Sequence, residues 1–189
     1  LGIDNVLAVT GDGEKSPGPN ASGKTTNKYS LELVEQIERM NQDQYEDDIF
    51  ESTPSDFCIG VGAYPEKHPE SPSLEQDIRY LKEKVAAGAD YIVSQMFFNN
   101  SDYFKFVKLC RSNDINVPII PGIKLITKKS QITSLPKHFS VNIPDDFALA
   151  MMASSSQEEC VDLGIKFALK QCEELMSANV PALHFYVMQ

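Results

Sequence analysis

Long apolar runs are missing from this sequence: none approaches the roughly 18 residues that an α-helix needs to cross a membrane. No signal peptide precedes the first apolar segment. We therefore expect no membrane partner and a cytoplasmic location.

Basic residues are few relative to acidic ones, with 17 Lys and Arg against 27 Asp and Glu, which gives a net charge of -10. Nucleic-acid binding depends on clustered Lys and Arg side chains that neutralise phosphates. We therefore expect no nucleic-acid partner. An acidic surface still permits an anionic ligand in a local pocket.

Cysteine is also sparse, and no two of the four residues form a C-x-x-C pair: Cys58, Cys110, Cys160 and Cys172. Paired spacings are typical of zinc sites and of disulfide frameworks in small secreted domains. We expect reduced thiols, as in a cytosolic protein, and no metal site.

Hairpin signals and internal repeats are absent, and strand-like and helix-like segments alternate instead. Short apolar runs predict strands at 6–9, 58–63, 91–98, 118–123 and 183–188. Helical periodicity or capping residues predict helices at 29–40, 73–87, 101–111, 129–135, 145–152 and 157–177. This alternation predicts one α/β domain over residues 1–189 with a parallel sheet.

The predicted strands end in polar or small residues: Asp12, Tyr64 with His68, Gln95, Gly122 with Lys124, and Tyr186. Such residues meet at the active face of a (β/α)8 TIM barrel. Since only five strands are visible, we expect a partial barrel whose first three strand-helix units precede Leu1.

The stretch YPEKHPE at residues 64–70 is the most distinctive of these strand ends. Its two prolines disfavour helical backbone just before them, so the loop is held extended. We expect it to present Tyr64 and His68 at the carboxyl end of the strand that precedes it.

Two other segments interrupt the alternation. Residues 13–28 are rich in Gly, Pro, Ser and Asn and predict a flexible loop, and residues 42–55 predict an acidic, solvated insertion. Within the first, residues 18–25 (GPNASGKT) match the P-loop pattern of nucleoside triphosphate hydrolases. The preceding strand ends several residues too early for that motif, and the segment equally fits a Gly-rich loop that matches by chance.

A second, broader series of motifs runs in order through the whole chain: Gly11-Asp12, Tyr29, YPEKHPE, Asp77 with Lys84, AGAD at 87–90, QMFF at 95–98, PIIPGI at 118–123 and His184-Phe185-Tyr186. This series closely resembles the methylenetetrahydrofolate reductase family. The resemblance implies the last five strands of a barrel that binds FAD across its strand ends. It also implies a homo-oligomer.

The resemblance implies a set of FAD-binding residues: Thr10, Gly11, Asp12, Tyr29, Ser30, Ala63, Tyr64, His68, Asp77, Tyr80 and Lys84. Asp77 and Lys84 would reach the adenosine and pyrophosphate half of FAD from one helix face. The folate substrate would contact Asp12, Gln95 and Tyr186. Asp12 is the catalytic residue that the resemblance implies.

The implied reaction is ping-pong reduction of 5,10-methylenetetrahydrofolate to 5-methyltetrahydrofolate through FAD, with NADH or NADPH as the hydride donor. The chain departs from the family pattern at Thr10, where Arg is usual, and at Lys124-Leu125, where an apolar-Pro step is usual. The family's general-acid glutamate would lie on a strand before Leu1. A catalytically incomplete module that binds flavin or folate is therefore the alternative to an enzyme.

Overall fold

The computed structural model describes residues 2–9, 27, 29–45 and 52–187. The predicted loop at 13–28 and the P-loop match at 18–25 thus lie almost entirely outside the described residues. The elements are β1 (Asn5–Ala8), α1 (Ser30–Asn41), β2 (Cys58–Ala63), α2 (Leu74–Ala86), β3 (Tyr91–Met96), α3 (Asn100–Ser112), β4 (Ile119–Ile123), α4 (Lys129–Phe139), α5 (Asp145–Ala153), α6 (Gln157–Ser177) and β5 (His184–Phe185).

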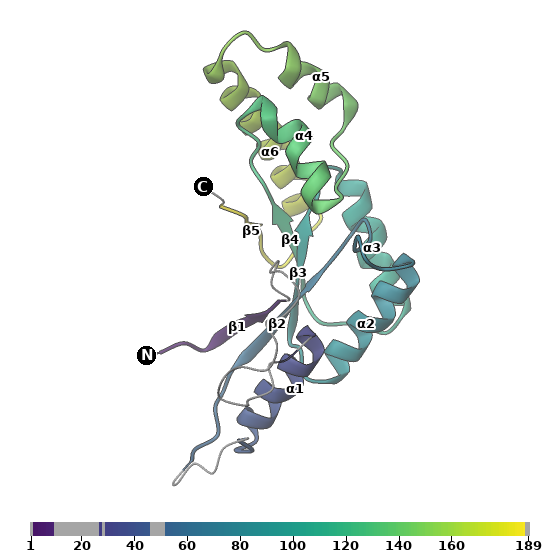
Figure 1. The fold of residues 1–189 in the computed structure, drawn as a ribbon, viewed down its shortest axis with the longest axis vertical. Coiled ribbons are helices and arrows are strands. Elements are labelled where there is room, and N and C mark those ends of the chain that lie inside the picture. Colours follow the sequence, from purple (N-terminus) through teal and green to yellow (C-terminus); the bar gives the residue numbers. More distant parts are fainter. Residues whose placement is uncertain (1, 10–26, 28, 46–51, 188–189) are drawn as a thin grey trace, which may run out of the picture.

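The five strands form one parallel sheet in the order β1-β2-β3-β4-β5, so strands that follow each other in the chain also pair in the sheet. The sheet curls into a half-barrel, with α1, α2 and α3 against one face and the edge strands β1 and β5 turned toward the other side (Figure 1). This confirms the predicted partial (β/α)8 barrel.

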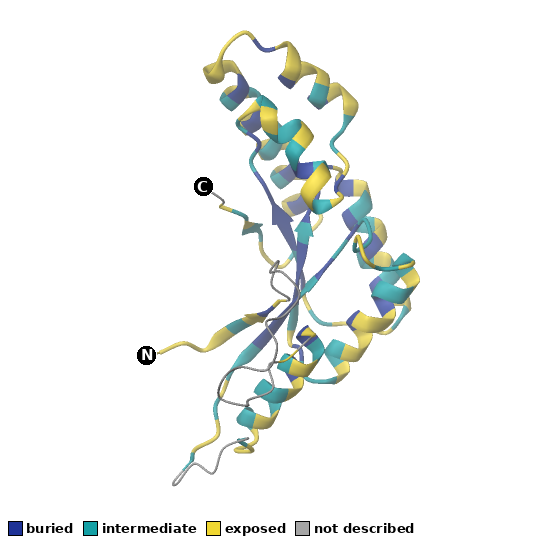
Figure 2. Cartoon of the chain, viewed as in Figure 1, coloured by how far each residue is buried: buried dark blue, intermediate teal, exposed yellow. Residues whose placement is uncertain are grey.

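The face of the sheet beneath the helices forms the main core. Ile59 and Val61 of β2, Ile92 of β3 and Ile119 of β4 are at most 1% exposed. They pack with buried residues of α1, α2 and α3, and the burial is densest in the three central strands (Figure 2). Burying large aliphatic side chains stabilises a fold by about 1.5 to 3 kcal/mol each, so this face holds the sheet and its helices together.

The opposite face of β2 has no side chains at Gly60 and Gly62, because successive residues of a strand alternate between faces. A Cβ on Gly60 would lie 2.3 Å from the ring of Tyr91, whose hydroxyl donates to the Val6 carbonyl oxygen at 3.3 Å. A Cβ on Gly62 would meet no described atom within 4 Å. Among the described residues, the open face of the half-barrel is therefore filled near β1 and unfilled near the end of β2.

A second core cluster lies beyond the strand ends and joins α4, α5 and α6. Buried Met96 and Phe98 pack there with Ile126 and Met151. The segment after β4 is thereby fixed against the three last helices. None of the described helices is both long and apolar enough to cross a membrane.

Three predicted boundaries are wrong. The strand predicted at 91–98 ends at Met96, because Phe97 packs into the main core and Phe98 into the second cluster instead of continuing in the sheet. The helix predicted to end at residue 135 continues through Pro136 to Phe139, because its apolar face packs into the second cluster and Ser140 N–H closes the last turn on the Pro136 carbonyl at 3.0 Å. The last strand spans two residues rather than six. It ends at Phe185 because the next carbonyl, that of Tyr186, accepts from the Lys124 ammonium at 3.1 Å instead of from a strand amide.

Candidate functional site at the strand ends

The carboxyl end of β3 contains a β-bulge. Val93 pairs with Ile120, whereas Met96 pairs with Gly122, so β3 has one more residue than β4 over this interval. Ser94 Oγ accepts from the Gly122 N–H at 2.9 Å. Bulges re-aim side chains next to functional sites, and this one sets the direction of Gln95.

Tyr186 lies directly over Gly122. A Cβ on Gly122 would be 2.5 Å from the Tyr186 ring and 2.3 Å from the Ser94 carbonyl oxygen, which also accepts from the Tyr186 hydroxyl at 2.9 Å. Burial, with a smaller contribution from Tyr64, raises the pKa of Tyr186 to about 12. Tyr186 is therefore a neutral phenol at neutral pH. Its hydrogen bond to the Ser94 carbonyl oxygen fixes the ring, and the lack of a side chain at Gly122 leaves room for it.

The loop between β2 and α2 folds back on itself, so the prediction of an extended loop is wrong. The Lys67 N–H donates to the Tyr64 carbonyl oxygen at 3.4 Å and the Ser71 N–H to the His68 carbonyl oxygen at 3.1 Å, because the φ that proline fixes also suits the second position of a turn. The rings of Tyr64 and His68 meet edge to face with centroids 4.5 Å apart. The backbone of Lys67 has φ 97°, a strained value for a residue with a side chain, and its ammonium donates to the His68 carbonyl at 3.0 Å. His68 Nδ1 accepts from the Glu70 N–H at 3.1 Å, which in the neutral ring leaves the proton on Nε2.

The same loop is attached to α2 through a carboxylate. The His68 N–H donates to Asp77 Oδ2 at 2.7 Å. Two helical turns later, burial lowers the pKa of the Lys84 ammonium, and the charge of Asp77 opposes that shift. Tyr64, His68, Asp77 and Lys84 thus form one connected group at the carboxyl end of β2.

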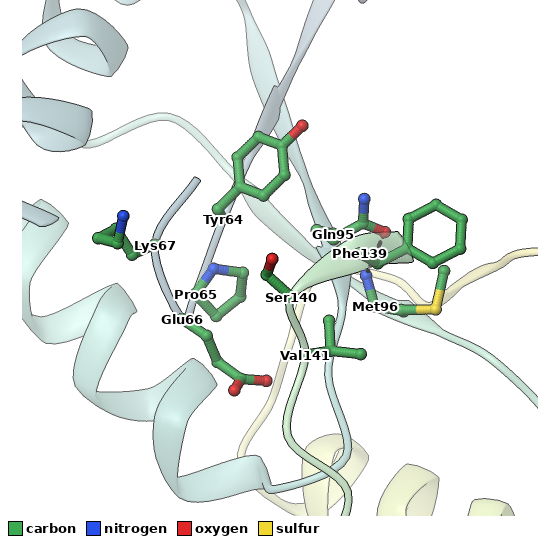
Figure 3. Close-up of a pocket in the computed structure, with 9 residues that line it drawn as sticks. All are labelled: Tyr64, Pro65, Glu66, Lys67, Gln95, Met96, Phe139, Ser140 and Val141. Carbon is green, nitrogen blue, oxygen red and sulfur yellow. Dashed lines mark hydrogen bonds between the residues drawn. The ribbon is translucent and has the colours of Figure 1, made fainter. Parts of the chain in front are cut away.

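A small hollow of about 10 Å³, room for a single water, separates this loop from the end of α4. Its lining residues are Tyr64, Pro65, Glu66, Lys67, Gln95, Met96, Phe139, Ser140 and Val141 (Figure 3). Gln95 Oε1 accepts from the Met96 N–H at 2.9 Å. Tyr64 and Gln95 therefore lie close together, on the wall of the same hollow. Because the hollow is too small for a ligand ring, a ligand would lie on the open face of the sheet.

Glu66 is a residue of the motif to which sequence analysis assigned no role. Tyr64 and Glu66 point to opposite sides of the loop (Figure 3). Glu66 Oε2 accepts from the backbone N–H of Asn142 at 3.0 Å and from its side-chain amide, while buried Oε1 has no hydrogen-bond partner in the described structure. Burial, with a smaller contribution from Asp102, raises the pKa of Glu66 against these hydrogen bonds. Glu66 therefore ties the loop that holds Tyr64 to the α4–α5 connection.

The Asn142→Asp variant should unfold with a free energy about 2 kcal/mol lower at neutral pH, because it loses an amide donor and sets a second carboxylate against Glu66. Since the pKa of Glu66 is already raised, the penalty should be full above that pKa and shrink as pH falls through it. Urea unfolding at about pH 8 and about pH 5 measures the difference. Asn116→Asp, at an exposed position, is the control; a penalty that is equal at both pH values would contradict the role given to Glu66.

The remaining predicted residues are placed as follows. Ser30 is buried in the first turn of α1, Tyr29 precedes it and is 58% exposed, and Ala63 is buried at the end of β2. Tyr80 is exposed on α2 and makes no hydrogen bond to the others within the described structure. Thr10, Gly11 and Asp12 lie outside the described residues.

A family model described as methylenetetrahydrofolate reductase matches residues 1–189, the whole chain. The chain belongs to this family. Similar curated proteins are methylenetetrahydrofolate reductase 1 of Schizosaccharomyces pombe, 32% identical over 99% of this chain and 29% of its own length, and methylenetetrahydrofolate reductase (NADH) 1 of Arabidopsis thaliana, 32% identical over 99% of this chain and 31% of its own. The 5,10-methylenetetrahydrofolate reductase of Salmonella typhimurium is 32% identical over 99% of this chain and 57% of its own length.

The chain thus spans about a third of the eukaryotic methylenetetrahydrofolate reductases and a little over half of the Salmonella protein. A solved structure of a Clostridium thermocellum protein, described as binding two copies of 5-methyl-5,6,7,8-tetrahydrofolic acid, covers 71% of this chain and 49% of its own at 18% identity, with a TM-score of 0.47.

Proposed function

We propose that this methylenetetrahydrofolate reductase homologue takes part in the reduction of 5,10-methylenetetrahydrofolate to 5-methyltetrahydrofolate, with NADH or NADPH as the hydride donor and FAD as the cofactor. The observation that carries the proposal is the convergence of Tyr64, Gln95 and Tyr186 at the carboxyl ends of β2, β3 and β5. Ligands of (β/α)8 barrels bind at this end of the strands.

The open face of β2 fits a flat ring system. As far as the structure describes the chain, Gly62 leaves space that a side chain would fill, and Ala63 and Tyr64 follow it at the strand end. We propose that the flavin ring lies against this face, and that His68, Asp77 and Lys84 hold the ribityl, phosphate and adenosine part, assisted by Tyr29, Ser30 and Tyr80. FAD, when bound, would carry the hydride between the nicotinamide and the folate.

Gln95 and Tyr186 suit the folate. An amide offers a donor and an acceptor to the paired groups of a pterin edge, and Gln95 Oε1 keeps a second lone pair while it accepts from Met96. The Tyr186 hydroxyl donates to Ser94 and can accept from a ligand. Because both substrates would use the same open face, we propose that they bind in turn.

Asp12 is the proposed catalytic residue of this chain. A carboxylate beside the reacting centre would stabilise the cationic iminium form of the folate. We expect Asp12→Asn to lower kcat for folate reduction about 100-fold and to change the Kd for FAD less than threefold. Stopped-flow absorbance at the flavin band measures the rate of folate reduction, and flavin fluorescence measures the Kd for FAD. Equal rates of folate reduction in the wild type and Asp12→Asn would exclude a catalytic role for Asp12.

The function itself is tested by methylenetetrahydrofolate-dependent oxidation of NADH and NADPH by the full natural polypeptide. Turnover with either nucleotide supports the proposal. Ligand binding without turnover would instead support the incomplete flavin- or folate-binding module. Homo-oligomerisation stays a prediction, which sedimentation velocity would check.

A further inference from the structure

Lys124 is a buried lysine at the mouth of the proposed site. It follows the last residue of β4 and is 6% exposed. Its ammonium donates to the Tyr186 carbonyl oxygen at 3.1 Å, the one hydrogen bond that the described structure gives it. Burial lowers the pKa of Lys124, and no carboxylate among the described residues opposes that shift.

Lys124 has fewer compensating charges and hydrogen-bond acceptors than two other lysines near the sheet, Lys84 and Lys67. Lys84 has the charge of Asp77 nearby, and the ammonium of Lys67 donates to the carbonyls of His68 and Ser71. An ammonium has three donors, and its burial costs several kcal/mol unless an opposite charge and further hydrogen bonds compensate. A single neutral acceptor leaves Lys124 only partly compensated.

The direction of Lys124 follows from the strand. Ile123 points toward the helices and is fully buried in the main core, whereas Gly122 faces the Tyr186 ring on the other side. Because side chains alternate, Lys124 continues on the side of Gly122 and Tyr186, which is the open side of the half-barrel. Its bond to the Tyr186 carbonyl agrees with this direction.

We propose that Lys124 is a specificity-determining residue of this site, whose ammonium binds a carboxylate or phosphate oxygen of the folate or the dinucleotide. The inference rests on the proposed function, since it assigns a role within that same site. An oxyanion would supply the missing charge and hydrogen bonds of a cation that is already desolvated, and such charge-assisted bonds are stronger than neutral ones.

The test uses Lys124→Gln, which keeps a donor for the Tyr186 carbonyl and removes the charge, and Lys124→Arg, which keeps the charge. Lys82→Met, at an exposed lysine paired with Asp114 on the far side of α2, is the control. Calorimetry measures the Kd of the full natural polypeptide for 5-methyltetrahydrofolate and for 5-methyltetrahydropterin, which lacks the p-aminobenzoylglutamate that carries the carboxylates. Flavin fluorescence measures the Kd for FAD and for riboflavin, which lacks the phosphates and the adenosine.

We expect Lys124→Gln to weaken binding of one anionic ligand about tenfold or more, to leave its uncharged counterpart unchanged, and to be rescued largely by Lys124→Arg. A loss confined to the intact folate identifies a carboxylate, and a loss confined to FAD identifies a phosphate. Unchanged affinities, or equal losses for charged and uncharged ligands, would overturn the inference and leave Lys124 a support for β5. If the wild type binds neither folate nor FAD, the proposed function fails first, and the inference fails with it.

Discussion

In the Gly122→Ala variant, we expect the free energy of unfolding to fall by about 3 kcal/mol and the proposed folate site to lose its shape. The added methyl group would lie 2.3 Å from the Ser94 carbonyl oxygen and 2.5 Å from the Tyr186 ring. The first contact is with backbone and is relieved only if β3 and β4 separate locally, and the second only if Tyr186 leaves its position. Urea unfolding measures the loss of stability.

The displaced tyrosine gives a second readout. Burial holds the pKa of Tyr186 at about 12, so a Tyr186 released to solvent should ionise closer to the ordinary value of about 10. Ultraviolet absorbance during an alkaline titration detects the change. Gly62→Ala is the matched control, because a Cβ there meets no atom of the described part of the chain within 4 Å. If Gly122→Ala is as stable as Gly62→Ala and its tyrosines titrate alike, the packing of Tyr186 described above is wrong.

The Gly164→Ala variant should lose about 4 kcal/mol of stability, the largest effect that we expect from a single methyl group. Replacing a helical glycine by alanine normally stabilises a protein by about 1 kcal/mol. At this position of α6, however, a Cβ would lie 1.7 Å from the Ile126 carbonyl oxygen. The helix would have to move away from the segment after β4, which also contains Lys124.

Thermal unfolding of Gly164→Ala, compared with Lys166→Ala at an exposed position of the same helix, measures this loss. The control should unfold within about 0.5 kcal/mol of the wild type. A Gly164→Ala protein that is more stable than the wild type would show that helix propensity outweighs the contact and that α6 packs less closely than described.

The sequence predicted the fold because its signals are local. Apolar runs, helical periodicity, the capping residue Ser73 and Gly88 after α2 all act within a few residues of their own position, and each element they predicted is present. The sequence also placed Tyr64 and His68 at the end of β2, but their ring contact was not predicted, because the prolines suggested an extended loop where the chain makes turns.

The long-range contacts that hold the site residues in place could not be predicted from local signals. Glu66 and Asn142 are 76 residues apart, and the hydroxyl of Tyr186 reaches a carbonyl 92 residues earlier. Such contacts depend on the curl of the sheet and on the extra residue in β3, neither of which leaves a local pattern. Lys124 was noticed as a polar residue at a strand end and as a departure from a family pattern, and its burial became evident from the packing of β4 against β5.

The central claim is that a flavin lies against the open face of β2. The most direct measurement is the visible absorption spectrum of the full natural polypeptide after incubation with FAD and desalting, for the wild type, Gly62→Ala and Gly62→Leu. We predict that the first two retain a flavin spectrum and that Gly62→Leu, whose side chain fills the vacant face, folds normally by circular dichroism but elutes colourless. Flavin retained equally by all three proteins, or by none, would contradict the claim.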